Sequence, residues 1–360
     1  MLPWRKRRKP FSEIEGDQDF LDALYRMLLG RPPDQGGLSH HLGRLQRGEA
    51  DRADLLRDFV NSPECLTNRR VKHHPHLGLT DYVAVADPTP FLPYVQQPAF
   101  GEAQLCELTN PRKWLDQAWL ECLRSMQIFS PALEDMHRKH YEYVQAAHGL
   151  TALGALGDEA GVLGVGAGHE ILLYWLANRA GRVVGTDLYE GEWAQDNALE
   201  GDPEVIANPA KYAPFAYPQD RLSFRRMDGR RLEYDDATWD VVYSLSSIEH
   251  FGGHSGAAAA MAEMGRVLRP GGVAAVATEL IVNGQRHPEF FSPADLLEYV
   301  VAPSGMMLVQ PPVFELPAYV LDNPLHLPAE RDYRPHLVLA ERGLVYTSVI
   351  LFFRKPAAAG

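Results

Sequence analysis

The chain has 360 residues, of which 46% are apolar and 23% charged, a composition typical of ordinary globular domains. This length favours two or three folding units, and no stretch reaches the ~18 apolar residues of a membrane span, so we expect no integral membrane segment. The formal net charge of -12 argues against a nucleic acid partner.

The first residues and the cysteines bear on the compartment. The basic residues from Arg5 to Lys9 are not followed by an apolar run, so we interpret them as a solvated tail rather than a secretory signal. Cys65, Cys106 and Cys122 are odd in number and form no CxxC pair, which is typical of a reduced compartment. The expected location is therefore cytoplasmic.

Residues 17–66 carry the pattern of three short amphipathic helices. Apolar residues recur at helical spacing, Gly30 and Gly48 end the first two helices, and Asp51 is expected to cap the third. We therefore predict a small all-α accessory domain in this region.

This region contains LYRMLLGRPPDQGGL and a closing SPE. With these motifs it resembles a bacterial domain of unknown function that occurs beside enzymes and secreted proteins linked to cell-surface polysaccharide. The resemblance implies a context of polysaccharide biosynthesis and an interaction module with a protein partner, and it implies no chemistry.

Residues 67–110 are rich in proline and histidine and lack periodicity, so we predict a linker packed over a neighbouring domain. The histidines at 73, 74 and 76 have no nearby cysteines or paired carboxylates, and we predict no metal site. A second domain, 111–356, is expected to open with two helices, the second of which ends at Gly149.

A strand, a tight turn and a helix follow in the segment GVLGVGAGHEILLYWLA, which begins at Gly161. Gly166 and Gly168 lack a Cβ, so a ligand can lie against the backbone, and the free N–H groups at the helix N-terminus favour an anionic group. Such a turn alone also fits a structural connection, so the spacing of the next strands has to decide.

Each of the next strands ends in a polar residue. The second ends at Asp187, 19 residues beyond Gly168, where an acidic side chain meets ribose hydroxyls in sheets of this kind, and Leu188 is expected on one adenine face. Later strands end at Asp228 and near Ser244. Because the carboxyl ends of parallel strands line one crevice, we expect these side chains and the glycine turn to contact one nucleotide-like ligand.

The ordered series VLGVGAGHE, VVGTDLY, RRMDGRRL, WDVVYSLSSIEHF and RVLRPGGVAAVAT resembles the motifs of class I S-adenosylmethionine-dependent methyltransferases. The resemblance implies a Rossmann-like α/β fold, with a seven-stranded doubly wound sheet whose last strand, YTSVILFFRK, is antiparallel. It also implies S-adenosylmethionine as the cofactor and methyl transfer as the reaction.

The family's binding roles carry over to matching positions. The resemblance implies that Asp187 binds both ribose hydroxyls, that Asp228 faces the adenine amino group, and that Ser244 lies beside the methionine portion. Gly229, next to Asp228, is also expected to bind the cofactor. The turn expected to line the methionine and ribose comprises Gly164, Val165, Gly166, Ala167 and Gly168.

Two positions depart from the family pattern. Gly164 stands where the first motif opens with an acidic residue, and Glu170 replaces its last glycine. Glu170 either contacts the ammonium group of the cofactor or is an exposed first-turn glutamate favoured by the helix dipole.

The segment GEWAQDNALEGDPEVIANPAKYAPFAYPQD replaces a simple second crossover helix. We interpret it either as a lid that borders the ligand or as a self-packed surface loop. The interpretation as a lid rests on its aromatic residues Trp193, Tyr212, Phe215 and Tyr217.

Methyl transfer requires in-line positioning, and a hydroxyl acceptor also requires a base. His250, just past the fourth strand, is the candidate base, with a structural histidine as the alternative, and Glu249 either orients the ligand or caps a helix. We expect a small-molecule or glycan acceptor, methylated on a hydroxyl oxygen.

Two other function classes stay open. An NAD-dependent sugar-modifying oxidoreductase or epimerase also has a glycine turn followed by an acidic residue, but its fingerprint requires glycine at the position of His169. The other is a catalytically idle cofactor-binding scaffold.

Overall fold

The computed structural model describes residues 14, 16–29, 31–62, 81–127, 135–189 and 201–357. These residues belong to two compact units, of which unit 1 comprises Met1–His74 with Asp332–Arg334 and unit 2 comprises Pro75–Arg331 with Pro335–Gly360. No helix in the described ranges is both long and apolar enough to cross a membrane.

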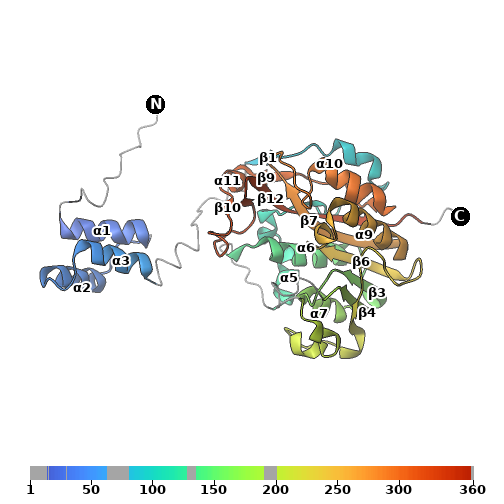
Figure 1. The fold of residues 1–360 in the computed structure, drawn as a ribbon, viewed down its shortest axis with the longest axis horizontal. Coiled ribbons are helices and arrows are strands. Elements are labelled where there is room, and N and C mark those ends of the chain that lie inside the picture. The colour runs from blue at the N-terminus through green and yellow to red at the C-terminus, as the bar shows by residue number, and fades with distance from the viewer. Residues whose placement is uncertain are drawn as a thin grey trace. The chain divides into compact units, whose positions relative to one another are not determined.

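The described residues of unit 1 form three helices, as the sequence predicted: α1 (Asp17–Leu28), α2 (Gln35–Gln46) and α3 (Arg52–Asn61) (Figure 1). Asp51 and Asp54 form a reciprocal capping box at the start of α3, which satisfies backbone N–H groups that the helix leaves free. A separate apolar core, which includes Leu24, Leu55 and Phe59, holds the three helices together.

Unit 2 is built on a twisted sheet whose central strands have the order β5-β4-β3-β6-β7-β12. The first five are parallel to one another and β12 is antiparallel to β7, as expected for the last strand. Most of these strands are buried, which fits a parallel sheet covered on both faces. Their bounds are β3 Gly157–Val165, β4 Ala180–Asp187, β5 Leu222–Arg226, β6 Trp239–Leu245, β7 Leu268–Ile281 and β12 Leu344–Arg354.

Ten strands, rather than seven, belong to this sheet in the described residues. The difference arises at β12, because its outer edge is paired in turn by three short strands, β11 (Leu339–Glu341), β2 (Glu107–Leu108) and β8 (Met307–Leu308). A further strand, β10 (Leu325–His326), pairs with β11. Two other short strands, β1 (Tyr82–Ala84) and β9 (Glu315–Pro317), form a separate ribbon.

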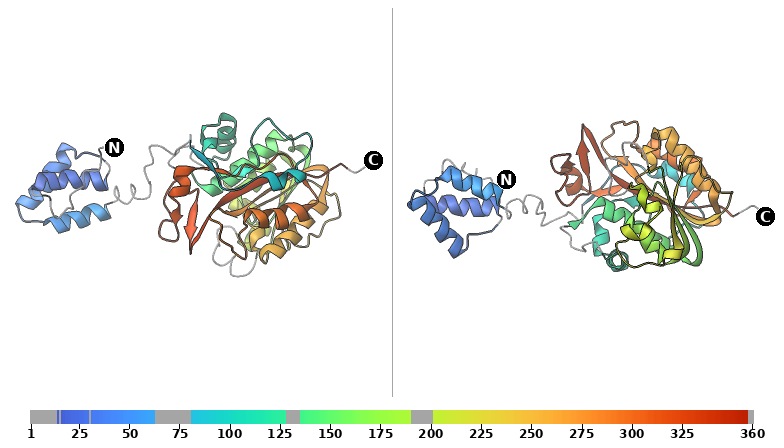
Figure 2. Two further views of the ribbon diagram at one scale, coloured as in Figure 1. Left: turned by 90° about the horizontal axis from the view of Figure 1, so that it is seen from above. Right: turned by 60° about the horizontal axis from the view of Figure 1, so that its bottom comes forward.

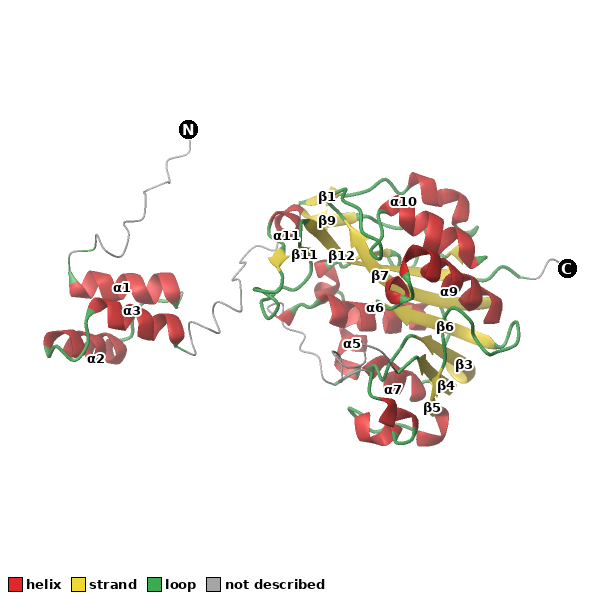
Figure 3. Cartoon of the chain, viewed as in Figure 1, coloured by secondary structure: helices red, strands yellow, loops and turns green. Residues whose placement is uncertain are grey.

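Helices cover both faces of the sheet (Figures 2 and 3). α5 (Gln117–Ser125), α6 (Arg138–Ala152) and α7 (Ile171–Ala177) pack in succession on one face, and α9 (Gly253–Val267) covers β6 and β7 on the other. Beside α9, the short helix α10 (Pro293–Asp295) continues into a helical segment that ends at Val301. A short helix, α11 (Ala318–Asp322), follows β9.

The structure differs from two expectations about the start of unit 2. Residues 81–110 belong to the segment predicted as a linker, but they contribute β1 and β2 to the fold. Because β2 pairs with the edge of β12, this segment packs against the sheet. It buries Phe91, Leu105 and Cys106 in the main core. The prediction that Gly149 ends a helix is wrong. α6 continues to Ala152, and glycine occupies position 149 because a Cβ there would lie 2.2 Å from the Phe352 ring.

Candidate functional site

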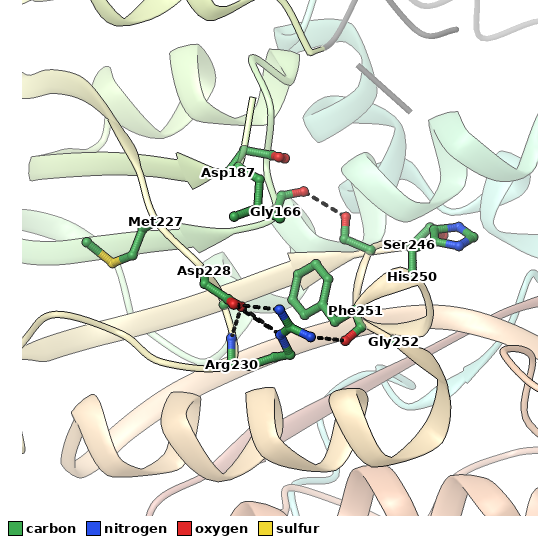
Figure 4. A pocket seen from close by; sticks show the side chains of 12 residues that line it. Gly166, Asp187, Met227, Asp228, Arg230, Ser246, His250, Phe251 and Gly252 are labelled. Carbon is green, nitrogen blue, oxygen red and sulfur yellow. Dashed lines mark hydrogen bonds and ion pairs between the residues drawn. The ribbon is translucent and has the colours of Figure 1, made fainter. Parts of the chain in front are cut away.

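The carboxyl ends of β3, β4, β5 and β6 surround a cavity of about 200 Å³, the first cavity (Figure 4). Such a position outside the strand ends is where ligands bind in sheets of this type. The lining residues are Gly166, Asp187, Leu188, Met227, Asp228, Gly229, Arg230, Ser246, Ser247, His250, Phe251 and Gly252.

A glycine turn follows β3 at one wall of the first cavity. Gly166 and Gly168 have positive φ angles of 63° and 45°, which glycine adopts without steric cost. The Gly168 N–H donates to Asp187 Oδ2 at 3.1 Å, so the carboxylate at the end of β4 faces the turn. Burial raises the pKa of Asp187, against the lowering effect of hydrogen bonds from the Tyr189 and Gly168 N–H groups.

Phe251 forms the floor between this turn and the loop after β5. A Cβ on Gly166 would lie 2.7 Å from Phe251 Cζ, and a Cβ on Gly229 would lie 2.5 Å from Phe251 Cε2. Ser247 Oγ also donates to the Gly166 carbonyl at 2.7 Å. Glycine at 166 is therefore required by the close approach of Phe251 as well as by its backbone conformation.

Asp228 is paired with Arg230 at the opposite wall. Arg230 Nη2 lies 2.7 Å from Asp228 Oδ2 and Arg230 Nε lies 2.9 Å from Oδ1, and this hydrogen bonding lowers the pKa of Asp228. Arg230 Nη1 also donates to the Phe251 carbonyl at 3.2 Å. The guanidinium therefore joins the two loops, as Figure 4 shows.

A second cavity, of about 180 Å³, adjoins the first and shares Gly166, Ser246, Ser247 and His250 with it. Its remaining lining comes from the start of α6, the glycine turn, the end of β6 and β7. These residues are Arg138, Lys139, Tyr143, Ala167, Gly168, Glu170, Leu245 and Glu279.

Ion pairs with the buried carboxylates of Glu142 and Glu279 make one wall of the second cavity. Arg138 Nη1 donates to Glu279 Oε1 at 2.6 Å, to Glu142 Oε1 at 3.1 Å and to Ser348 Oγ at 3.0 Å. Lys139 Nζ lies 3.1 Å from Glu142 Oε2. Each buried carboxylate therefore has a cationic partner, as a buried charge requires.

Glu249 lies behind this wall, fully buried, and accepts a hydrogen bond from Thr278 Oγ1 at 2.9 Å. Burial and then the adjacent carboxylate of Glu279 raise its pKa well above the usual value. Although burial opposes ionisation of Glu279 too, Arg138 holds the pKa of Glu279 below its ordinary range. We infer that the pair holds one proton and that Glu249 carries it.

Glu170 is buried at the second cavity, with 7% of its surface exposed, so it is not the exposed first-turn glutamate considered above. Burial and the neighbouring Glu170 raise the pKa of Tyr243. A Cβ on Gly164 would lie 3.0 Å from Tyr243 Oη. Tyr243 thus leaves no room for the acidic side chain that usually opens the motif, while Glu170 brings a carboxylate from the other end of the turn.

The structure brings most of the predicted residues together. Those that line one of the two cavities are Gly166, Ala167, Gly168, Glu170, Asp187, Leu188, Asp228, Gly229 and His250. Gly164, Val165, Ser244 and Glu249 do not line either cavity. Ser244 is buried and donates to the Val165 carbonyl at 2.7 Å, because it lies within β6 rather than beyond the end of the strand.

The candidate base lies at the two cavities, whereas the described aromatic residues of the insertion do not. His250 lines both cavities, and its Nδ1 lies 3.2 Å from Glu289 Oε2. Tyr212, Phe215 and Tyr217 line neither cavity, and Tyr217 packs edge-on against Tyr174 instead. Tyr174 belongs to α7, so this contact packs the segment against the domain, whereas Tyr212 Oη donates to Asp202 within the segment. Both contacts favour the surface loop over the lid. Trp193 lies outside the described residues, as do His73, His74 and His76.

Comparison with known proteins gives two domain families. Residues 163–276 match a family described as a methyltransferase domain, and residues 11–68 match a domain of unknown function, DUF4214. Among curated proteins, methyltransferase GfsG of Streptomyces halstedii is 30% identical over 131 residues, which cover 34% of this chain and 41% of that protein. The chain thus spans about two fifths of the length of this relative.

Solved structures are similar to this chain at low sequence identity. Geranyl diphosphate C-methyltransferase from Streptomyces coelicolor A3(2) is 15% identical with a TM-score of 0.40, over 72% of this chain and 91% of that one. A Burkholderia thailandensis 1,6-didemethyltoxoflavin-N1-methyltransferase is 16% identical with a TM-score of 0.37, over 68% and 80%. On the family match and the fold described above, the chain carries a class I methyltransferase domain beside a domain of unknown function.

Proposed function

We propose that the protein transfers a methyl group from S-adenosylmethionine to a hydroxyl oxygen of a small-molecule or glycan acceptor. The observation that carries this proposal is the Asp187 carboxylate, which faces the Gly168 N–H at 3.1 Å and lines the same cavity as Gly166. A carboxylate at this position binds ribose hydroxyls in nucleotide-binding sheets. Leu188 and Met227 supply apolar surface beside it for an adenine ring.

The residues present fit the two ends of S-adenosylmethionine. The first cavity would hold the adenosine portion, with Asp187 on the ribose and Asp228 toward the adenine amino group. The second cavity would hold the methionine portion, with Glu170 accepting hydrogen bonds from the ammonium group. When bound, the cofactor supplies an electrophilic methyl group on a sulfonium, and the sulfur keeps the electron pair of the broken bond.

His250 is the proposed base for the acceptor hydroxyl, because it lies where the two cavities meet. If Nδ1–H donates to Glu289, Nε2 is left to accept the proton that the hydroxyl loses as its oxygen bonds to the methyl carbon. Glu249 is a poor alternative, since it is fully buried and lines neither cavity, and burial raises its pKa well above the usual value.

Calorimetric titration of the full chain with S-adenosylmethionine and, separately, with NAD tests the proposal. We expect binding of the first and none of the second. Binding of NAD alone would support the oxidoreductase or epimerase, and binding of neither ligand would refute the proposed enzyme. The idle scaffold predicts cofactor binding with no methyl transfer to any acceptor.

A further inference from the structure

A groove of about 450 Å³, which we call the outer groove, lies beyond the end of the β7–β12 strand pair. Its main lining side chains are Arg286, His287, Phe290, Glu341, Arg342 and Tyr346. β7 ends at Ile281 and the antiparallel β12 begins at Leu344. The outer groove therefore lies at the same edge of the sheet as the two cavities.

The outer groove and the second cavity lie on the same face of these two strands. Ser348, which accepts a hydrogen bond from Arg138, is opposite Glu279 in the β12–β7 strand pair. Tyr346 is opposite Ile281, two residues nearer the end of the strand pair, so these side chains point to the same face of the sheet. The loop after β7 borders both sites, because Glu289 contacts His250 while Phe290 packs against Tyr346 with ring centroids 4.8 Å apart.

The two arginines of the outer groove have unused guanidinium groups. Both residues are exposed, and neither side chain forms a hydrogen bond or ion pair with any residue that the structure describes. Guanidinium groups bind phosphate and carboxylate with paired hydrogen bonds. Glu341 is the one carboxylate of the lining, so the groove as a whole favours an anion.

Arg342 is held in an unfavourable backbone conformation. It forms the two-residue turn between β11 and β12 with Gly343, and the φ angles are 49° and 87°. Turns of this type favour Asn-Gly, because an ordinary side chain at positive φ is strained. Asn283 Nδ2 donates to the Gly343 carbonyl at 2.9 Å and fixes the turn beside the 285–290 loop. Strain of this kind is often found where a side chain has a function.

We infer that the outer groove binds the distal part of an anionic, ring-bearing acceptor, such as a sugar that carries a phosphate or carboxylate group. The aromatic pair Phe290 and Tyr346 contacts the apolar face of a ring, and Arg286 and Arg342 bind the anionic group. The hydroxyl to be methylated then reaches His250 at the second cavity. This inference rests on the proposed function and narrows its acceptor to the anionic class.

Binding calorimetry on the full chain saturated with S-adenosylhomocysteine tests the inference, with three probes: uridine diphosphate glucose, glucuronate and glucose. We expect at least one anionic probe to bind at least tenfold more tightly than glucose. Uridine diphosphate glucose alone indicates a phosphate-bearing acceptor, and glucuronate alone a carboxylate-bearing one. Equal affinities for all three probes, or no binding of any, would overturn the inference.

Variants assign the binding to the groove. R286Q and R342N should each weaken binding of the anionic probe at least fivefold. R342N gives the turn the Asn-Gly sequence that turns of this type favour, so the turn itself should be preserved. R124Q, at an exposed arginine on α5, should leave the affinity unchanged. Unchanged affinity in R286Q and R342N would contradict the inference. S-adenosylmethionine titrations of the same variants should match the unmodified chain, so a defect in the cofactor site is distinguished from one in the groove.

Discussion

The two adjoining cavities of this protein differ in how they are built. The first consists of residues at the ends of β3, β4, β5 and β6 or in the loops that follow them, and its walls combine glycine backbone, apolar side chains and two carboxylates. The second depends on ion pairs between α6 and β7, which the Ser348 hydroxyl of β12 joins by a hydrogen bond. We conclude that the first cavity is set by local motifs and the second by long-range packing.

Removal of a carboxylate from the ion cluster should have the largest effect. Glu142 is fully buried and accepts from Arg138, Lys139, Ser246 and Ser348. Glu142→Gln should lower the free energy of unfolding by about 3 kcal/mol, because the neutral amide cannot replace all the hydrogen bonds of the buried carboxylate, and hydrogen bonds to charged groups contribute ~1.5–3 kcal/mol each. Glu279 still holds Arg138 in this variant. Urea unfolding, followed by fluorescence of the buried tryptophans of unit 2, measures the loss.

Glu204→Gln is the control, since Glu204 forms an exposed pair with Lys211 in the same unit. An exposed pair contributes ~0–1 kcal/mol. Equal losses in the two variants would mean that the buried cluster is no more important for stability than a surface ion pair.

This contrast also explains which parts of the site could be predicted from the sequence and which could not. The glycine turn, Asp187 and Asp228 follow strands whose order a motif series fixes, so their meeting at one edge could be foreseen. Arg138 and Glu279 are 141 positions apart, and no motif indicates that they meet. The family motif pointed to Ser244, but the serines that line the first cavity are Ser246 and Ser247, two and three positions later. The reason is that β6 continues to Leu245, so Ser244 lies inside the strand.

Likewise, the extra strands on β12 could not be predicted. β2 and β8 have two residues each, too few for a periodic pattern, and they form because β12 has an edge to be paired. Phe251 was also missed as a floor residue. A large apolar side chain just after the SLSSIEH segment, beside Gly166 and Gly229, is the only signal that could have indicated it.

Asp187→Asn tests the first cavity. The neutral amide cannot give the ribose hydroxyls the same charged hydrogen bonds, which contribute ~1.5–3 kcal/mol. S-adenosylmethionine should therefore bind roughly 10- to 150-fold more weakly in calorimetry. Asp220→Asn, at an exposed aspartate before β5, is the control and should bind normally. A full-affinity Asp187→Asn variant would remove the main support for the cofactor site.

Glu170→Gln tests the proposed contact between Glu170 in the second cavity and the ammonium group of the methionine portion. Loss of a charged partner for the ammonium group should weaken S-adenosylmethionine by about tenfold, the lower end of the range for charged hydrogen bonds, ~1.5 kcal/mol. 5′-Methylthioadenosine lacks the amino acid portion, so its affinity should not change in this variant. Equal weakening of both ligands would assign Glu170 a structural role instead.

The shared proton of Glu249 and Glu279 predicts a pH dependence of stability. The pKa of Glu249 in the folded state is raised above the value of 4.5 that it has in the unfolded chain. Above pH 4.5 the folded state therefore keeps a proton that the unfolded state releases. The free energy of unfolding consequently falls as pH rises from 4.5 to the folded-state pKa. Glu249→Gln, a neutral mimic, should remove this loss, so the variant gains up to about 1.4 kcal/mol per pH unit relative to the unmodified chain. Urea unfolding between pH 5 and 8 measures the difference, and parallel curves would refute the shared proton.

Leu188→Ala should have the smallest effect, because Leu188 contributes only apolar surface to the first cavity and is already 39% exposed. Loss of its contact with adenine should cost about 1 kcal/mol, which is roughly fivefold in affinity for S-adenosylmethionine. Ile206 is an unusually close control, since it is also 39% exposed and lies outside both cavities. If Ile206→Ala weakened the cofactor as much as Leu188→Ala, the loss would reflect general loosening of the fold, and the apolar wall of the first cavity would no longer be part of the binding site.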